Sequence, residues 1–363
     1  MEFLWYIPNQ VQPGHRLDDT VEDHNGLRRL TALARSVEEH GWGGALIGTG
    51  WKRPDTFTVA TALAAGTETF NPLIAIRPGY WDPAHFASSA ATLDQLSGGR
   101  VKVNIVSGTD HQAQYGDDEG DQAQRYARTR EFMRLVRRLW TEDEVTVEGE
   151  HYRVSGATLE HRPAARDGRP HPQLYFGGAS EAAQRTAASE ADVQLFWGEP
   201  LDGVAARIDH LKALSTELNR DLPPLEFGLR ITTVVRDTTD EAWADAEARV
   251  AAMAAGRDEW EADPGRRVAV GQQRLIDLAQ QGDVLDDCLY TAPARVGGGG
   301  AGSTWLVGSA DDVAKALRRY ADLGVTHFVL SDTPYEREIA RIGDSLLPLL
   351  TSLPETDAHQ GEL

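Results

Sequence analysis

Two glycines followed by a serine form the segment of this sequence best suited to binding an anion. Gly177, Gly178 and Ser180 come directly after the apolar run Gln173–Phe176 and before the helical pattern of Ser180–Glu190. Glycines let the backbone approach a ligand closely, and the free N–H groups at the start of a helix attract negative charge. A phosphate could therefore bind here without a basic side chain. An ordinary strand-to-helix turn with a serine cap is the alternative interpretation.

Asn104 and Ser107 are the polar residues of a second candidate segment, Val101–Ser107. In this segment β-branched and polar residues alternate between a Gly-Gly-Arg turn and a Gly-Thr-Asp loop, which predicts a strand. Side chains near the carboxyl ends of strands face the ligand in a parallel α/β barrel. Asn104 is therefore a candidate ligand-binding residue, or else its amide only satisfies a backbone group inside the barrel.

The elements that must position these residues alternate between strand and helix along the chain. Amphipathic helical patterns separate most of the apolar segments, and Asp55 and Pro83 are suited to the first positions of two helices. This alternation indicates a (β/α)8 barrel, with an open doubly wound sheet as the alternative. The eight predicted strands begin at Phe3, Gly44, Leu73, Val101, Gln173, Val193, Phe227 and His327.

The remaining candidate residues follow the other predicted strands, because a barrel places its site on the loops after the strands. Trp197 could stack on a flat ring or simply cover the barrel rim. The candidates at these positions are Thr49, Arg53, Trp81, Trp197, Arg230, Thr232, Thr333 and Tyr335.

The predicted barrel is a single domain over residues 1–353, followed by a flexible tail, 354–363. Segments that break the strand–helix rhythm predict insertions at about 107–124, 141–172 and 256–304. The last insertion ends in the glycine run 297–300, which predicts a mobile segment.

Composition excludes several classes of function. The net charge of −20 argues against binding to nucleic acid or to an anionic membrane, since both require a basic surface. Cys288 is the only cysteine, so an intrachain disulfide and a cysteine-based metal site are impossible. The segment Met1–Pro8 has neither a basic region nor a long apolar core, which predicts a cytoplasmic protein without a signal peptide or a membrane span. The candidate residues contain no metal-binding spacing and no Gly-x-Ser-x-Gly motif.

Eight short motifs occur in order along nearly the whole chain. They are Ala-Thr-Leu-Asp-Gln-Leu-Ser-Gly-Gly-Arg (91–100), Asn-Ile-Val-Ser-Gly (104–108), Arg-Tyr-x-Arg-x-x-Glu-Phe (125–132), Tyr-Phe-Gly-Gly-Ala-Ser (175–180), Trp-Gly-Glu-Pro (197–200), Phe-Gly-Leu-Arg (227–230), Gly-Gly-Ala-Gly (299–302) and Phe-Val-Leu-Ser (328–331). Together they resemble the bacterial luciferase-like flavin monooxygenases, and among these most closely the alkanesulfonate monooxygenases that use reduced FMN.

This resemblance implies a barrel that takes reduced FMN from a separate NAD(P)H-dependent FMN reductase and uses it with O2 to oxygenate a small substrate. Such chemistry requires a pocket closed against water, so a lid is expected, with Arg295–Ser303 as the candidate and a plain linker as the alternative. The cofactor-binding residues implied by the resemblance are Asn104 near the isoalloxazine ring, Tyr126 and Ser180 at the phosphate, and Gly177, Gly178, Trp197 and Thr49 along the flavin.

The substrate side departs from the pattern of the alkanesulfonate enzymes. Where those enzymes typically carry Cys, His, Tyr and His, this chain has Arg53, Thr232, Thr333 and Tyr335, whereas Arg230 matches. Arg53 and Arg230 could clamp an anion by paired hydrogen bonds, although Arg53 could instead pair with one of the abundant acids. The expected catalytic residues are Arg230, Thr232, Arg53 and Thr333. The expected substrate-binding residues are Arg53, Arg230, Trp81, Arg295 and Tyr335.

The expected reaction is cleavage of the carbon–sulfur bond of an alkanesulfonate, a small organosulfur anion, to give an aldehyde and sulfite. The open alternatives are a sulfone, a sulfosugar or another carbon–heteroatom substrate, a deazaflavin (F420)-dependent oxidoreductase, and a flavin-binding protein without catalysis. Relatives assemble through barrel helices, so the resemblance also implies a homodimer or homotetramer.

Overall fold

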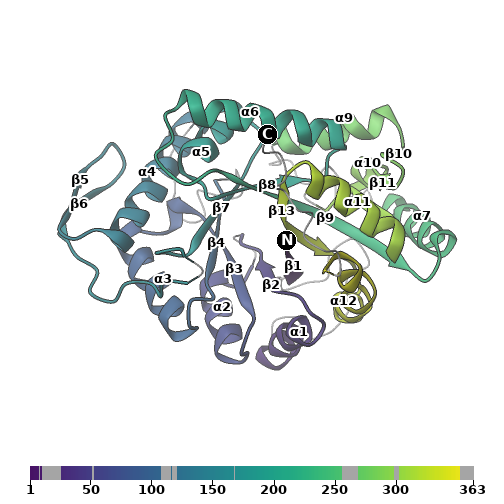
Figure 1. Ribbon diagram of the computed structural model, residues 1–363, viewed down its shortest axis with the longest axis horizontal. Coiled ribbons are helices and arrows are strands. Elements are labelled where there is room, and N and C mark those ends of the chain that lie inside the picture. Colours follow the sequence, from purple (N-terminus) through teal and green to yellow (C-terminus); the bar gives the residue numbers. More distant parts are fainter. Residues whose placement is uncertain are drawn as a thin grey trace, which may run out of the picture.

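Eight parallel strands form a closed barrel at the centre of the molecule (Figure 1). The computed structural model describes residues 1–7, 9, 26–50, 53–107, 116, 121–166, 168–255, 269–297 and 302–351. Each barrel strand pairs in parallel with its neighbours, and pairing between the strands at 193–197 and 226–236 closes the ring. This arrangement confirms the predicted (β/α)8 barrel and excludes the open sheet. The barrel strands are β1 (Glu2–Ile7), β2 (Gly44–Ile47), β3 (Asn71–Ile76), β4 (Lys102–Ile105), β7 (Gln173–Gly177), β8 (Val193–Trp197), β9 (Glu226–Arg236) and β13 (Val325–Ser331).

Helices cover the outside of the barrel, and two of them begin as the sequence predicts. The Asp55 carboxylate accepts a hydrogen bond from the Thr58 N–H, and Pro83 is the first residue of its helix. The helices around the barrel are α1 (Leu27–Glu39), α2 (Thr56–Ala65), α3 (Pro83–Leu96), α4 (Gln122–Thr141), α5 (Glu181–Glu190), α6 (Leu201–Glu217), α7 (Thr239–Ala255), α11 (Ala310–Asp322) and α12 (Tyr335–Thr351).

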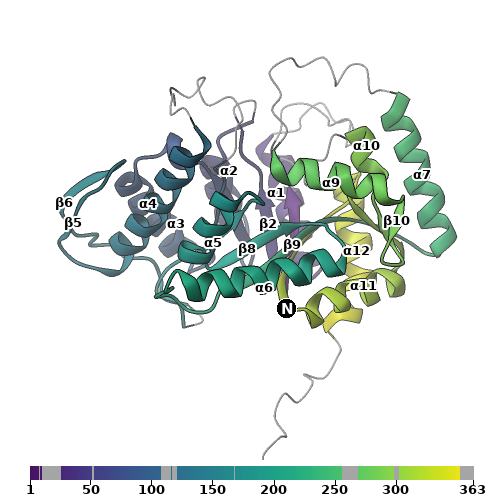
Figure 2. The ribbon, with the colours of Figure 1, turned by 90° about the horizontal axis from the view of Figure 1, so that it is seen from above.

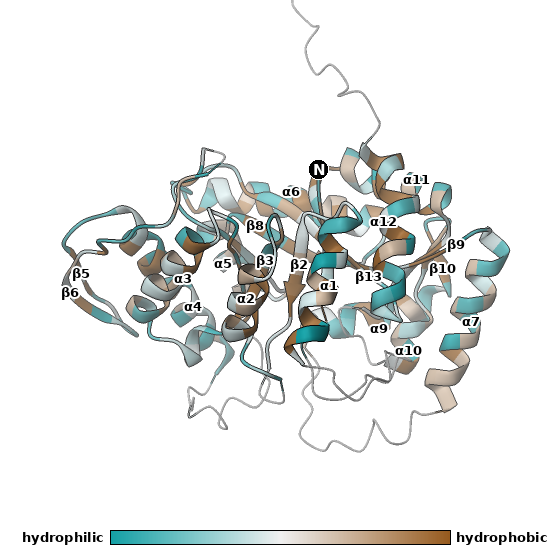
Figure 3. Cartoon of the chain, turned by 90° about the horizontal axis from the view of Figure 1, so that it is seen from below, coloured by the Kyte–Doolittle hydropathy of each residue, from teal (hydrophilic) through white to brown (hydrophobic). Residues whose placement is uncertain are grey.

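The apolar core has two parts because successive strand residues point alternately into and out of the barrel. The large outer part lies between strands and helices, and Figure 3 shows hydrophobic strands such as β2 and β9 beside helices such as α1, whose outer side is hydrophilic. A smaller cluster packs within the ring of strands. Its residues are Leu4, Leu46, Leu73, Ala75, Tyr175, Val193, Leu195 and Val329. Burying one such leucine or valine contributes about 1.5–3 kcal/mol to stability.

The end of the barrel where the strands begin holds a buried ionic cluster around His327. Its ring Nε2 lies 2.6 Å from a Glu226 carboxylate oxygen, and Nδ1 lies 3.0 Å from Glu2. The Tyr175 hydroxyl donates to the same Glu2 oxygen at 2.9 Å. Burial disfavours the imidazolium, but hydrogen bonds to both carboxylates outweigh it and raise the pKa of His327. Burial also opposes ionisation of the two acids, yet the contacts with His327 and with Lys102 or Arg169 lower the pKa of Glu2 and of Glu226 to about 2.

Two excursions from the barrel were only partly predicted. The hairpin of β5 (Val145–Glu148) and β6 (Arg153–Ala157) is antiparallel, lies within the predicted insertion at about 141–172, and projects beyond α3 and α4 in Figures 1 and 2. The prediction missed β12 (Trp305–Ser309), which pairs in parallel with the second half of β9. Since β9 outruns β8, its free edge accepts this extra strand.

The insertion at 256–304 contains α9 (Val270–Gln281), β10 (Val284–Leu285), β11 (Leu289–Tyr290) and α10 (Pro293–Gly297) within its described part. Figure 2 shows α9 and α10 at the opposite end of the barrel from the N-terminus, which is the end where the strands finish. The glycine run beyond Gly297, the tail 354–363 and most of the predicted insertion at 107–124 lie outside the described residues.

Candidate active site

Arg53 and Arg230 both contact the side chain of Tyr6 at the carboxyl end of the barrel strands. The guanidinium carbon of Arg230 lies 4.7 Å from the centre of the Tyr6 ring, and its Nη1 donates to the Ser331 hydroxyl at 2.9 Å. Arg53 Nη1 lies 3.4 Å from the Tyr6 hydroxyl and donates to the Asn9 carbonyl at 2.9 Å. The structure thus brings together the two arginines predicted to clamp an anion. Only 6% of the Arg230 surface is exposed, which strengthens its attraction for a negative charge.

The loop after β13 brings Tyr335 to the same place. Its ring centre lies 5.9 Å from that of Tyr6. The loop is anchored by Asp332, which is 2% exposed and accepts hydrogen bonds from the Thr333 N–H at 2.8 Å and from Arg249 Nη1 at 2.5 Å. Arg236 forms a second ion pair with Asp332 at 3.2 Å. These buried contacts fix the loop that carries two of the predicted residues, Thr333 and Tyr335.

Asn104 lies on β4 between Ala75 on β3 and Tyr175 on β7. Its side chain is buried, and no donor among the described residues reaches its Oδ1. Leaving a buried acceptor unpaired costs about 1–3 kcal/mol. A flat ligand that offers an N–H group would remove this cost, and the isoalloxazine ring of a reduced flavin carries such groups.

The glycine–serine turn after β7 requires a glycine at its second position. Gly178 has a φ of +142°, and a Cβ at this position would stand 2.6 Å from the Cβ of Ala183, so only glycine fits. The Ser180 hydroxyl accepts from the Ala183 N–H at 3.3 Å, which confirms the predicted cap of α5. The Tyr126 hydroxyl lies beside the turn, 3.5 Å from the same Cβ position of Gly178. The two residues predicted at the flavin phosphate, Tyr126 and Ser180, therefore both lie beside Gly178, which was predicted along the flavin.

Arg207 supports this turn from α6. Its Nη2 donates to the Gly178 carbonyl at 3.1 Å, while its Nη1 pairs with the buried carboxylate of Glu199 at 2.6 Å. The other Glu199 oxygen pairs with Arg274 of α9. One buried carboxylate therefore links the glycine–serine turn to the insertion.

Two predicted residues lie with the insertion and not with Arg53 and Arg230. The ring of Trp197 packs against Gly271 of α9, 3.3 Å from where a Cβ would stand. Arg295 donates to the Ala279 carbonyl at 2.6 Å and pairs with Asp283. The side chain of Arg295 is thus used within the insertion, since it binds the end of α9.

Three further predicted residues occupy other positions. Trp81 stacks on His85 with ring centres 5.8 Å apart and belongs to an aromatic cluster with Phe57 and Phe86. Thr232 is buried on β9, with its hydroxyl 3.4 Å from the Gly302 carbonyl. Thr49 follows β2 and is partly buried.

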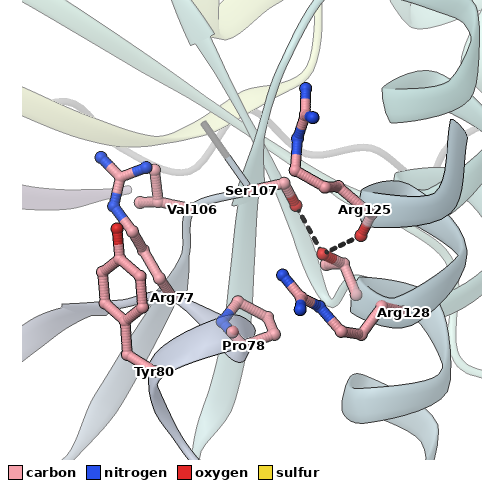
Figure 4. A pocket seen from close by; sticks show the side chains of 9 residues that line it. Arg77, Pro78, Tyr80, Val106, Ser107, Arg125 and Arg128 are labelled. Atoms are coloured by element: carbon pink, nitrogen blue, oxygen red, sulfur yellow. Dashed lines mark hydrogen bonds between the residues drawn. The ribbon is translucent and has the colours of Figure 1, made fainter. Parts of the chain in front are cut away.

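A cationic pocket beside the β4 exit includes residues that the sequence prediction missed (Figure 4). Arg77 and Tyr80 line it from one side, around the short helix η1 (Pro78–Tyr80), and Arg125 and Arg128 line it from α4. The Ser107 hydroxyl, just after β4, forms a 2.7 Å hydrogen bond with the Thr129 hydroxyl of α4. The sequence pattern that could have predicted this pocket is the spacing of Arg125, Arg128 and Thr129, because residues at i, i+3 and i+4 share one helix face.

Several other kinds of chemistry find no support in the described part of the chain. No group of three or more His, Cys, Asp or Glu side chains in the described ranges could hold a metal ion. Burial raises the pKa of Cys288 to about 12, so its thiol stays protonated and is a poor nucleophile. Within the same residues, no helix is long and apolar enough to cross a membrane.

Comparisons with known proteins agree with this barrel. The chain is similar in fold to the long-chain alkane monooxygenase LadA (15% identity over 99% of this chain and 93% of that one, TM-score 0.75). It is also similar in fold to DmoA from Hyphomicrobium sulfonivorans (19% identity over 96% of this chain and 87% of that one, TM-score 0.75). A third similar structure is the coenzyme F420-dependent tetrahydromethanopterin reductase from Methanopyrus kandleri (17% identity over 96% of this chain and 99% of that one, TM-score 0.68). The model of the family described as luciferase-like monooxygenase matches residues 1–327. The chain therefore belongs to the luciferase-like monooxygenase family.

Proposed function

We propose that this protein is the oxygenase of a two-component system that cleaves the carbon–sulfur bond of a small alkanesulfonate. A separate NAD(P)H-dependent reductase supplies reduced FMN. One atom of O2 becomes bonded to the carbon that carried sulfur, which gives an aldehyde, and sulfite is released. The other oxygen atom is reduced to water, and reduced FMN is oxidised to FMN. The observation that carries the proposal is the meeting of Arg53 and Arg230 at Tyr6, which places two cations at the barrel mouth of an acidic monooxygenase-family protein.

The described residues fit a flavin at this end of the barrel. Reduced FMN, when bound, supplies the two electrons that activate O2. The amides of the turn 177–180 and the Tyr126 hydroxyl would hold its phosphate, and the unpaired Asn104 Oδ1 would accept a hydrogen bond from its ring. Arg53 and Arg230 would orient the sulfonate next to the ring. The insertion, docked on Trp197, would exclude water from one side.

Replacing Gly178 with alanine is expected to weaken the affinity for reduced FMN at least about tenfold, because the new methyl group must displace Ala183 or the turn itself. Anaerobic fluorescence titration measures this affinity. Gly324→Ala is the matched control, since Gly324 also has a positive φ, +102°, but has nothing within 4 Å of its Cβ position. Equal flavin affinity in Gly178→Ala and the wild type would count against a phosphate at this turn.

Ser180→Ala and Tyr126→Phe are each expected to weaken flavin affinity by about three- to tenfold while the fold stays intact, because each removes one hydroxyl beside the turn. Ser309→Ala is the control, because Ser309 caps α11 in the same way and lies at the end of β12. It should lose a similar amount of stability, about 1 kcal/mol, without a change in flavin affinity. Unchanged flavin binding in both Ser180→Ala and Tyr126→Phe would remove the proposed phosphate contacts.

The proposed reaction is tested by supplying reduced FMN and O2 to the purified protein with a series of 1-alkanesulfonates and measuring sulfite. Sulfite release that requires flavin, oxygen and sulfonate together is the expected result. Oxygenation of dimethyl sulfone without any sulfonate turnover would reassign the substrate. No sulfite and no other oxygenated product would indicate a flavin-binding protein without catalysis.

A hydride-transferring enzyme that uses F420 is the second candidate function, and the similarity in fold to an F420-dependent reductase favours it. Binding of reduced F420 in place of reduced FMN distinguishes the two. We also propose that the protein is cytoplasmic and forms a homodimer or homotetramer. Light scattering after size-exclusion chromatography would measure the number of chains in the oligomer.

A further inference from the structure

The hydroxyl of Tyr6 stands out because it is a hydrogen-bond donor among cations. Tyr6 lies on β1, is partly buried, and packs against the cluster inside the barrel. Arg53 Nη1 donates toward its oxygen at 3.4 Å, and the guanidinium group of Arg230 lies over its ring. The backbone of Gly48 leaves room for the hydroxyl, which stands 3.2 Å from where a Cβ of residue 48 would be.

Among the residues that the structure describes, the hydrogen of this hydroxyl meets no acceptor. A phenol both donates and accepts, whereas a guanidinium group only donates. Neither Arg53 nor Arg230 can therefore accept the Tyr6 hydrogen. The hydrogen bond from Arg53 uses the oxygen of the hydroxyl, and within the described residues no carbonyl or carboxylate receives its hydrogen. Next to two positive charges, the natural acceptor for this hydrogen is a negatively charged oxygen of a ligand.

We propose that Tyr6 determines specificity by donating a hydrogen bond to one oxygen of the substrate's sulfonate group, beside Arg53 and Arg230. This inference rests on the proposed function and adds a residue to its substrate site. A sulfonate carries three oxygens at the corners of a pyramid, so three donors from three elements match it. A carboxylate has only two oxygens, whose lone pairs lie in one plane, so donors that converge from three elements match it less well than the pyramid of a sulfonate.

The position of the hydroxyl is fixed before any substrate arrives. Arg230 covers one part of the Tyr6 ring, and Tyr335 packs against it with ring centres 5.9 Å apart. Little side-chain freedom is therefore lost on binding, which favours a strong contribution to affinity.

Tyr6→Phe tests the proposal because it keeps the ring and both ring contacts and removes only the hydroxyl. Calorimetry with anaerobic, FMNH2-saturated protein measures the Kd of 1-butanesulfonate, and sulfite release measures KM and kcat. We expect Kd and KM to rise about tenfold, with a smaller change in kcat. We also expect the preference for 1-butanesulfonate over pentanoate to narrow. The affinity for FMNH2 and the Tm should not change. Tyr290→Phe on β11 is the matched control and should leave all of these values unchanged.

The outcomes separate this inference from the function on which it rests. If the wild type releases sulfite and Tyr6→Phe binds 1-butanesulfonate as tightly as the wild type, the role of Tyr6 is overturned and the proposed function stands. If the wild type neither binds nor oxygenates any sulfonate, both are overturned.

Discussion

Replacing Arg230 with methionine is expected to lower kcat/KM for an alkanesulfonate by about a thousandfold, equivalent to about 4 kcal/mol, because a buried charge that pairs with the substrate is lost. Methionine preserves much of the side-chain volume, so the barrel should still fold. Arg230 is positioned by the Ser331 hydroxyl and by the face of the Tyr6 ring. These contacts hold the guanidinium group in one position, so we do not expect another cationic side chain to take over its role.

Arg230→Lys refines this experiment because it keeps the charge and loses the planar fork of donors. We expect kcat/KM between those of the wild type and Arg230→Met, with FMNH2 affinity unchanged in both variants. Arg185→Met is the control, since Arg185 forms an exposed pair with Glu217 on the outside of the barrel. A value for Arg230→Met within threefold of the wild type would show that the anion binds elsewhere.

Replacing His327 with glutamine is expected to lower the free energy of unfolding by about 2 kcal/mol at pH 6, because it removes the buried cation shared by two partly buried carboxylates. His327 lies 3.0 Å from Glu2 and 2.6 Å from Glu226. The cluster is at the end of the barrel opposite the proposed site, so flavin and sulfonate affinities should remain those of the wild type. Urea unfolding measures the stability change.

The effect of His327→Gln should depend on pH in a defined direction. The pKa of His327 is raised from 6.5 in the folded protein, so its contribution is complete below about 6.5 and is lost as pH rises through the folded-state pKa. The pKa values of Glu2 and Glu226 fall from 4.5 to about 2, so their contribution is complete above 4.5 and is lost as pH falls toward 2. The stability difference between wild type and variant should thus be largest between pH 4.5 and 6.5 and shrink at alkaline pH. A difference that stays constant from pH 5.5 to 9 would contradict a charged His327.

The sequence predicts the barrel well because most of its strands can be recognised from a local pattern of apolar residues. The strands β1, β2, β3 and β13 are short apolar runs between turn residues, and a local pattern suffices to find such runs. The strand β12 was missed because Trp305–Ser309 is short and follows a glycine run. Its partner is the second half of β9, so its pairing depends on a register that local patterns do not contain.

The site was partly predictable for a geometric reason. A closed barrel brings all strand exits to one end, so residues as distant in sequence as Arg53 and Arg230 had to approach each other. Tyr6 was missed because it lies inside a strand, where alternation indicates burial and not contact with two arginines. The positions of Trp197 and Arg295 follow from how α9 and α10 pack on the barrel, which depends on tertiary contacts and not on periodicity.

Anaerobic titration of the purified protein with reduced FMN tests the central claim most directly, because every proposed step requires this flavin at the barrel mouth. We expect saturable binding of one FMNH2 per chain, weakened at least about tenfold by Gly178→Ala and left unchanged by Gly324→Ala. Binding of reduced F420 without binding of FMNH2, or FMNH2 binding that is indifferent to Gly178→Ala, would contradict it.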